Sequence, residues 1–526
     1  MTITTAELPH PRTAGAGLAP ALKLAPLALA AMLLSAECRA DWKVTPLAEL
    51  RETYSTNVAT ERDDVAHNSF VTEAAPGLAV SSNGPRLTLN ASAQWRVFSY
   101  SNKEAPNVQD SDRRYQADAR AMLVDEFLYV DAGAGSQRQN VSAFGPLAGN
   151  PYSGANRTQV STWRISPYLR HRFGNTATAT ARFTRDSVDS SYNGFGSSVA
   201  STTLLDLSSG TSSTNLGWNV SYNRQEQNNR IGGRSSLDNG IVGLRYRVLP
   251  HLSLTASAGY DSYDYASLND STSGASWSAG FVWTPSTRTS VQASFGHRYF
   301  GKTGALDASH RTRHTVWSAT YSDEITTTRS QFLLPAAFDT AAMLDGMFAS
   351  AYPDPVQRRA AIQAYMAAAG LPASLADSIN FLSNRYVRAK RLQFAAVLRG
   401  ARSNLALSVF QDQRAALSLQ QSDSALLGNQ LASINDNVRQ RGASADAEYR
   451  LSTRTTMRAG VYAVRAQSLD TGVASTNRRW QVGMNRQIDR HVSGVLELRH
   501  VVGSFGVVSN DRYHENAIAA ALSVQY

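Results

Sequence analysis

Arginine recurs at every second position in several stretches of this sequence, as at Arg245 and Arg247. If such a stretch forms a β-strand, side chains two positions apart point to the same face, so these guanidinium groups would gather on one side of a sheet. A guanidinium group stays charged and can hold a carboxylate or a phosphate with two parallel hydrogen bonds. The arginines expected on this face are Arg86, Arg96, Arg114, Arg120, Arg182, Arg245, Arg247, Arg298, Arg458 and Arg499. Together they predict a surface that attracts anions.

Carboxylates on the same face leave a second interpretation open. They are Asp118, Asp131, Asp261, Asp446, Glu448 and Glu497. Lysine and arginine exceed aspartate and glutamate by 51 to 41, which gives a formal net charge of +10. The arginines therefore either attract anions or pair with neighbouring acids to satisfy a polar interior. The basic excess is not concentrated in a groove-reading element, so nucleic acid is not an expected partner.

Residues suited to catalysis or metal binding give weak signals. His310 and His314 are four positions apart, a spacing that suits metal ligands on a helix, but their HRTRH segment is predicted to be a strand and its mouth. No Gly-x-Ser-x-Gly segment, nucleotide-binding glycine loop or carboxylate pair stands out. We therefore expect a protein that is not an enzyme and that uses no cofactor.

Strands with one apolar and one polar face must position these arginines. In residues 86–97, apolar side chains occupy the odd positions and polar ones the even positions, and the same period recurs through most of the chain up to the closing Tyr526. Most tryptophans share the apolar face: Trp95, Trp163, Trp218, Trp277, Trp283, Trp317 and Trp480. This pattern predicts an all-β fold, a transmembrane antiparallel β-barrel with tryptophan at the membrane interfaces.

Turn residues set the expected number of strands. Short connections such as Asn83-Gly84 and Pro285-Ser286 alternate with longer polar stretches such as residues 140–159. With both termini in the periplasm, these connections predict about 22 strands, within a range of roughly 20 to 24. The least regular strands are expected around residues 44–58 and near residues 326–334.

Residues 335–384 interrupt the strand pattern. Asp354 and Pro355 suit the start of a helix that runs through an Ala-rich segment to Gly370, and Leu371-Pro372 begins a second short helical run. We expect a helical hairpin inserted in one external loop. It either folds over the mouth of the barrel or is a surface feature without a gating role.

The N-terminus predicts secretion. Arg12 and Lys23 precede an apolar run over residues 24–34, followed by the segment Ala36-Glu37-Cys38-Arg39-Ala40, which we interpret as a cleavage site. The run is shorter than the roughly 20 apolar residues that span a bilayer, so it is typical of a signal peptide. Removal of residues 1–40 would leave residues 41–526 as a barrel in the bacterial outer membrane, without the single cysteine, Cys38.

Several segments resemble the PEP-CTERM system-associated outer membrane protein family. They are residues 42–46, 52–58, 71–78, 166–168, 283–289, 296–301, 354–358, 370–372 and 513–518. The family-motif positions are Pro285, Gly296, Phe300, Gly301, Tyr513, Glu515 and Asn516. The resemblance implies a Gram-negative outer-membrane barrel linked to exopolysaccharide and exosortase gene clusters. It offers no catalytic residues to carry over.

From these features we expect a channel associated with the export of a polysaccharide. Its expected partners are outer-membrane lipid, an acidic polysaccharide and periplasmic export components. Two alternatives of similar build are a solute-uptake porin and a structural scaffold of an export complex. A transporter with a separate N-terminal plug domain is disfavoured, because strands begin soon after the expected cleavage site.

Overall fold

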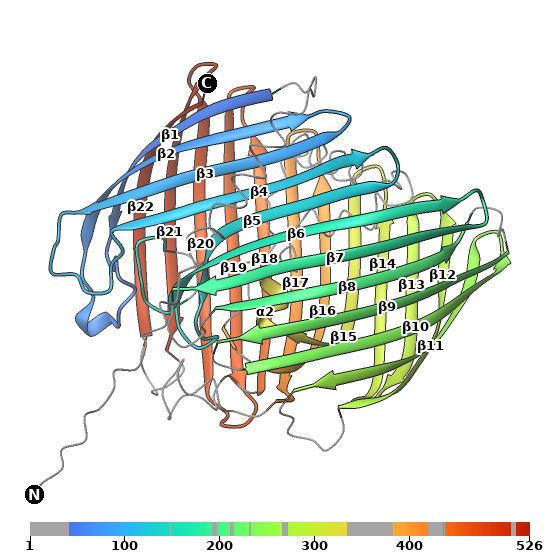
Figure 1. The fold of residues 1–526 in the computed structure, drawn as a ribbon. Helices are drawn as coiled ribbons and strands as arrows, with labels where there is room; N and C mark the ends of the chain where they lie inside the picture. Colours follow the sequence, from blue (N-terminus) through green and yellow to red (C-terminus); the bar gives the residue numbers. More distant parts are fainter. Residues whose placement is uncertain are drawn as a thin grey trace, which may run out of the picture.

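A single closed sheet of 22 antiparallel strands forms the protein in this computed structural model (Figure 1). The structure describes residues 42–146, 150–191, 197–210, 215–230, 233–265, 272–333, 382–383, 385–418, 435, 437–505 and 512–525. The first strand closes the ring on the last, with Leu47 opposite Gln525 and Ser55 opposite Ala517. Closure leaves no free sheet edge, as the hydrocarbon core of a membrane requires. The predicted fold class and strand number are confirmed.

The strands follow one another around the ring in sequence order. Two short helical segments, η1 (Asp63–Val65) and α2 (Thr328–Leu333), lie between strands. The strands are β1 (Trp42–Ser55), β2 (Ser69–Asn83), β3 (Leu87–Tyr100), β4 (Ser111–Val124), β5 (Leu128–Asn140), β6 (Arg157–Phe173), β7 (Ala177–Ser190), β8 (Ser198–Ser209), β9 (Leu216–Asn229), β10 (Gly233–Leu249), β11 (Leu252–Asp264), β12 (Ser273–Ser286), β13 (Thr289–Arg298), β14 (Gly301–Arg311), β15 (Thr315–Thr327), β16 (Tyr386–Arg399), β17 (Ser403–Ala416), β18 (Asn437–Arg450), β19 (Thr455–Ser468), β20 (Ala474–Gln487), β21 (Val492–Ser504) and β22 (Arg512–Gln525).

The two faces of the wall differ as the alternation predicts. On β10, Val242, Leu244 and Tyr246 are each more than half exposed on the outside. Arg245 and Arg247 alternate with them and therefore face the lumen. An apolar outer surface that surrounds the whole barrel suits contact with lipid, so the chain is a transmembrane barrel of the outer-membrane type.

The two ends of the barrel carry connections of different lengths. At the end where β1 begins and β22 ends, the connections are short, as at residues 174–176 and 250–251; we call it the turn end. Gly174 adopts the left-handed φ of +55° that such a tight turn needs. The opposite, loop end carries longer connections, with the described residues 56–68, 141–146, 150–156 and 328–333. In bacterial barrels the short turns are periplasmic, which assigns the turn end to the periplasm.

The predicted short strand near residues 326–334 is wrong beyond Thr327, where β15 ends and α2 begins. Thr327 Oγ1 accepts a hydrogen bond from Ser330 N, and Ser330 Oγ accepts one from Thr327 N, both at 3.1 Å. This reciprocal capping starts a helical turn and overrides the strand preference of the threonine run.

Two other predictions fall outside the described residues: the signal peptide over residues 1–40, and the helical hairpin with its caps at Asp354 and Gly370. The first strand is confirmed, with β1 beginning at Trp42 and ending at Ser55 instead of spanning residues 44–58. Among the described residues, no helix is long and apolar enough to cross a membrane.

Candidate functional site in the barrel lumen

The arginines predicted to line the lumen fall into a paired and an unpaired population. Arg86, Arg96, Arg114, Arg120, Arg182, Arg298, Arg458 and Arg499 each form an ion pair with a carboxylate. Arg245 and Arg247 form none with the described residues. The interpretation that lumen arginines satisfy a polar interior therefore describes the first population, whereas the second keeps its charge available.

Arg96 on β3 lies between two buried carboxylates. Its Nη2 donates a hydrogen bond to Glu73 Oε2 at 2.9 Å, and its Nη1 lies 3.6 Å from Asp112 Oδ2. Asp112 also accepts a hydrogen bond from Arg114 Nε at 2.8 Å and lies 3.3 Å from Arg138 Nε. The side chains of Glu73 and Asp112 are 1% and 0% exposed. Because buried charges need partners, this network stabilises the wall and leaves little free charge there.

Glu515, one of the family-motif positions, is the centre of a second buried network. Its Oε1 accepts hydrogen bonds from Ser55 Oγ at 2.8 Å, Arg499 Nη2 at 2.9 Å and Asn150 Nδ2 at 3.1 Å. Ser55 and Arg499 belong to the neighbouring strands β1 and β21, whereas Asn150 belongs to the connection between β5 and β6. This carboxylate therefore attaches that connection to the wall; we call its described residues, 141–146 and 150–156, loop 141–156.

Tyr152 is a second attachment of loop 141–156 to the same part of the wall. Its hydroxyl group forms a hydrogen bond with Thr53 Oγ1 at 2.7 Å and another with Glu73 Oε2 at 3.3 Å. Its ring packs edge-on against Phe98, with 5.3 Å between the ring centroids. Burial raises the pKa of Tyr152 to about 12, so the hydroxyl group stays neutral and can donate. The loop is thus folded inward rather than extended into solvent.

The other side of loop 141–156 contacts a different part of the wall, at β18 and β19. Ala143 and Phe144 form a buried cluster with Val438 of β18 and Ala466 of β19. Ser142 Oγ donates a hydrogen bond to Asn435 Oδ1 at 3.2 Å. The strands β1 to β4 and β20 to β22 lie between β5 and β19 on the shorter arc of the ring. The loop therefore crosses the lumen at the loop end.

A second segment crosses from another direction. Arg329 of α2 forms an ion pair with Asp186 on β7, and its Nε donates to Ser198 Oγ on β8 at 2.9 Å. The strands β9 to β14 separate β8 from β15, which precedes α2. The two crossing segments meet in one buried apolar cluster: Val141, Val160, Val188, Phe332 and Leu382. Together they narrow the lumen at the loop end.

Residues 296–301, with the sequence GHRYFG, cover the end of β13, the connection and the start of β14. Arg298 donates two hydrogen bonds to Asp261, from Nε to Oδ2 and from Nη2 to Oδ1, both at 2.8 Å. The Phe300 ring lies 5.5 Å from Arg298 Cζ and 4.9 Å from Arg388 Cζ, within the range of cation–π contact. Gly301 adopts a φ of +108°, which a side chain would strain. These motif positions build a tight, charge-paired turn.

The other family-motif positions have structural contacts of their own. Pro285 lies where the pairing of β12 with β13 shifts register, and a Cβ atom at Gly296 would lie 2.1 Å from Trp277 O. Tyr513 is buried and its hydroxyl group donates a hydrogen bond to Asn477. Asn516 exchanges hydrogen bonds with Thr56, through Thr56 N to Asn516 O at 3.0 Å and Asn516 N to Thr56 Oγ1 at 2.9 Å.

The remaining predicted arginines pair more locally. Asp131 accepts a hydrogen bond from Arg120 Nε at 2.8 Å and another from Arg182 Nη1 at 3.0 Å. Near the turn end, Arg86 Nη2 lies 3.1 Å from Asp125 Oδ2. Arg458 Nε lies 3.0 Å from Glu448 Oε2 in the same region.

Unpaired arginines gather near the turn end. In the part of the chain that the structure describes, no ion pair is formed by Arg170, Arg172, Arg245, Arg247, Arg288, Arg311, Arg313, Arg399, Arg402 and Arg450. The sequence prediction missed Arg288, Arg311, Arg313 and Arg399, because alternation assigns no face to residues in and beside turns. A usable signal was present in the sequence, since arginine recurs immediately before or after many of the short connections.

The two histidines of the HRTRH segment do not form a metal site with the described residues. His310 Nδ1 forms a hydrogen bond with Thr289 Oγ1 at 2.9 Å, and His314 lies in the following turn. The described residues contain no group of three or more His, Cys, Asp or Glu side chains arranged to hold a metal ion.

Comparisons with known proteins locate similar barrels among solved structures. No protein-family model and no curated protein matches the chain. The apoprotein form of the FrpB iron transporter from Neisseria meningitidis is similar over 92% of this chain and 81% of that chain, with 10% identity and a TM-score of 0.49. The siderophore receptor PiuA from Acinetobacter baumannii covers 91% and 82%, with 8% identity and a TM-score of 0.47. Pseudomonas aeruginosa OpdK with vanillate covers 92% and 99%, with 7% identity and a TM-score of 0.33.

Proposed function

We propose that this barrel is a conduit for anionic solutes across the outer membrane. The observation that carries the proposal is the group of arginines near the turn end that form no ion pair with the described residues, whereas eight of the ten arginines predicted to line the lumen are paired. A guanidinium group without a carboxylate partner attracts anions into a confined passage. Several weak contacts in succession bind a solute and still release it, as conduction requires.

The resemblance to the PEP-CTERM system-associated family supports an acidic exopolysaccharide as the solute. In this form of the proposal, the polymer passes from the periplasm through the basic turn end, and periplasmic export components deliver it. Carboxylate groups on successive sugar residues would contact successive arginines.

A second candidate, uptake of small anionic solutes, is favoured by the crossing segments. Loop 141–156 and α2 lie across the loop end and are held there by buried contacts. Such a constriction admits small molecules more readily than a thick polymer. A deletion strain separates the two functions, because it loses either extracellular polysaccharide or growth on an anionic solute.

Conductance of the purified barrel in a planar bilayer tests the shared part of both functions. In a salt gradient, the reversal potential of the wild-type protein should indicate anion selectivity. The R245Q/R247Q variant should be less selective, whereas R245K/R247K should keep the selectivity because it keeps the charge. A wild-type barrel that shows no conductance would contradict the conduit and favour the scaffold alternative.

A further inference from the structure

Three neighbouring hairpins meet at the turn end and bring their basic residues together. The connection between β14 and β15 stands in the middle. Arg311 N donates a hydrogen bond to Arg288 O at 2.8 Å, which joins it to the connection between β12 and β13. On its other side, Arg399 N donates to His314 O at 2.7 Å, which joins it to the end of β16. The barrel wall thus fixes the relative positions of these three turns.

The middle turn is held in one conformation by a threonine. Thr312 Oγ1 accepts hydrogen bonds from Thr315 N at 2.9 Å and His314 N at 3.2 Å. Thr312 N also donates to Thr315 O at 2.8 Å. A hydroxyl group that binds the backbone two or three residues ahead is a common way to fix a turn. The turn therefore presents Arg313 and His314 from a defined backbone.

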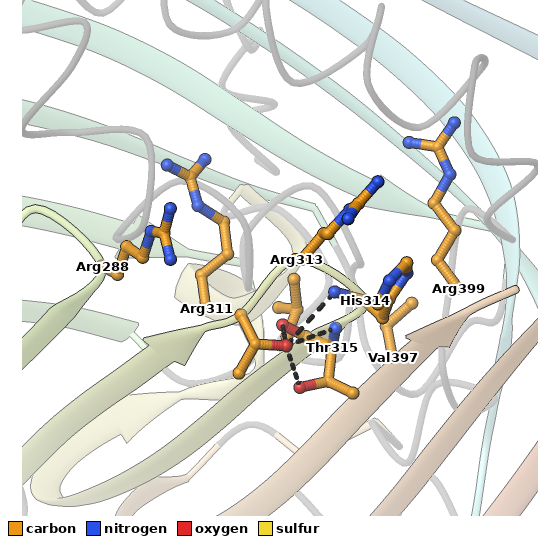
Figure 2. A pocket seen from close by; sticks show the side chains of 9 residues that line it. Arg288, Arg311, Arg313, His314, Thr315, Val397 and Arg399 are labelled. Atoms are coloured by element: carbon orange, nitrogen blue, oxygen red, sulfur yellow. Dashed lines mark hydrogen bonds between the residues drawn. The ribbon is translucent and has the colours of Figure 1, made fainter.

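A pocket of about 430 Å³ lies among these turns (Figure 2). Its lining includes Arg288, Arg311, Arg313 and Arg399, and among the described residues no carboxylate lines it. In Figure 2 the guanidinium groups of Arg288 and Arg311 lie close together in the view; Arg313 projects from the turn that follows Arg311, and Arg399 from the end of β16. These four arginines form no ion pair with the described residues.

The pocket combines a basic rim with an apolar floor. Val316 and Val397 are paired across β15 and β16 and are 3% and 2% exposed. The volume lies within the range of about 300–1,000 Å³ that is usual for small-molecule sites. A bare inorganic ion would use the arginines and leave the valines without a partner. An organic molecule would use both, because its carbon skeleton can contact the floor while its charged groups reach the rim.

A second, smaller pocket continues the basic surface. It has a volume of about 170 Å³, shares Arg399 with the first pocket and adds Arg402 and Arg450. Its one carboxylate, Glu448, is already paired with Arg458 at 3.0 Å. A ligand longer than the first pocket would therefore continue to meet positive charge.

We infer that these two adjoining pockets together form one discrete binding site for organic polyanions that carry carboxylate or phosphate groups on a carbon skeleton. Repulsion among like charges held close together disfavours the empty site, and a bound polyanion relieves it. Guanidinium groups hold carboxylates and phosphates with paired hydrogen bonds. The inference goes beyond the proposed conduit, since it assigns a saturable site and its ligand class at the periplasmic end.

Calorimetric titration of the full-length barrel in detergent tests the inference. The probes are trigalacturonate, its fully methyl-esterified form and a sugar bisphosphate, with inorganic pyrophosphate as a polyanion that has no carbon skeleton. Trigalacturonate or the bisphosphate should bind saturably and more tightly than pyrophosphate, and the neutral ester should not bind. The arm that binds more tightly identifies carboxylate or phosphate as the natural group.

Matched variants locate the binding. R311Q/R399Q should weaken it by about tenfold or more, since each lost charge-assisted contact is worth a large part of a tenfold change. R245Q/R247Q removes the same charge at residues that do not line either pocket, and it should weaken the binding less than R311Q/R399Q does. Equal losses in both variants, or no saturable binding to the wild type, would overturn the inference. Anion-selective conductance without polyanion binding would reject this site alone, whereas binding without conductance would reject the conduit alone.

Discussion

Arg329, in the first turn of α2, forms an ion pair with Asp186 on β7, and their side chains are only 3% and 6% exposed. The pair joins a segment that leaves the wall after β15 to a strand on a distant part of the ring. Removing one partner of a buried pair leaves the other charge without compensation. A substitution of one partner of this pair should therefore weaken the attachment of α2 to that strand.

Substituting Arg329→Gln should release α2 from β7 and β8. The buried Asp186 would lose its cation, at a cost of about 3–5 kcal/mol to the docked conformation. We expect a larger single-channel conductance with more current noise, measured in planar bilayers. Arg329→Lys, which keeps the charge, should remain close to the wild type. Conductance traces of R329Q identical to those of the wild type would show that α2 does not narrow the passage.

The period-two alternation predicted the barrel, because each strand has to place one face toward lipid and the other toward the lumen. It assigned Arg245 and Arg247 to the inside for the same reason. Alternation carries no information about which inward side chains meet, since this depends on the register of several strands. Arg298 and Asp261, for example, lie on β13 and β11 and reach each other past β12.

The crossing of the lumen was beyond sequence reasoning for another physical reason. Tyr152 and Phe144 lie in a segment without periodicity, and their partners Thr53 and Val438 are far away in the chain. The pocket at the turn end was missed because its arginines lie in and beside turns. Their positions follow from three adjacent hairpins, and only the closed ring places these side by side.

Two adjacent positions on β13 test which face of the wall meets lipid. Ala293 lies opposite Phe281 and Leu306 on the outer face, whereas its neighbour Gln292 lies inside, opposite Asp307. Ala293→Arg should lower the free energy of unfolding by about 2–4 kcal/mol, the cost of arginine near the bilayer midplane. Gln292→Arg should change it by less than about 0.5 kcal/mol, because the lumen is polar. Equilibrium unfolding in liposomes measures both values. Equal costs would contradict the assigned sidedness.

Gly296 tests whether a family-motif position is fixed by packing. A Cβ atom there would lie 2.1 Å from Trp277 O, so Gly296→Ala must displace the paired strand β12. We expect a loss of about 1–3 kcal/mol in the free energy of unfolding, as is usual for overpacking. Gly240→Ala is the matched control, because a Cβ atom at Gly240 meets nothing within 4 Å. A loss of the same size in both variants would point to the backbone instead of the contact.

Arg298 distinguishes the paired arginines from those available to solutes. Asp261 is fully buried and accepts both hydrogen bonds from Arg298 at 2.8 Å. Arg298→Gln would therefore leave the buried carboxylate of Asp261 without a cationic partner. The expected loss in the free energy of unfolding is about 3–5 kcal/mol, measured by chemical denaturation. Replacing both partners in R298Q/D261N removes the charge problem and should recover most of that stability.

The same double variant separates stability from selectivity. Because the pair is neutral as a unit, R298Q/D261N should keep the anion selectivity of the wild type, whereas R245Q/R247Q should lower it. The reversal potential in a salt gradient measures both. Lost selectivity in the double variant would show that Arg298 acts on permeating anions despite its partner, and that ion pairing does not divide the lumen arginines into two functional classes.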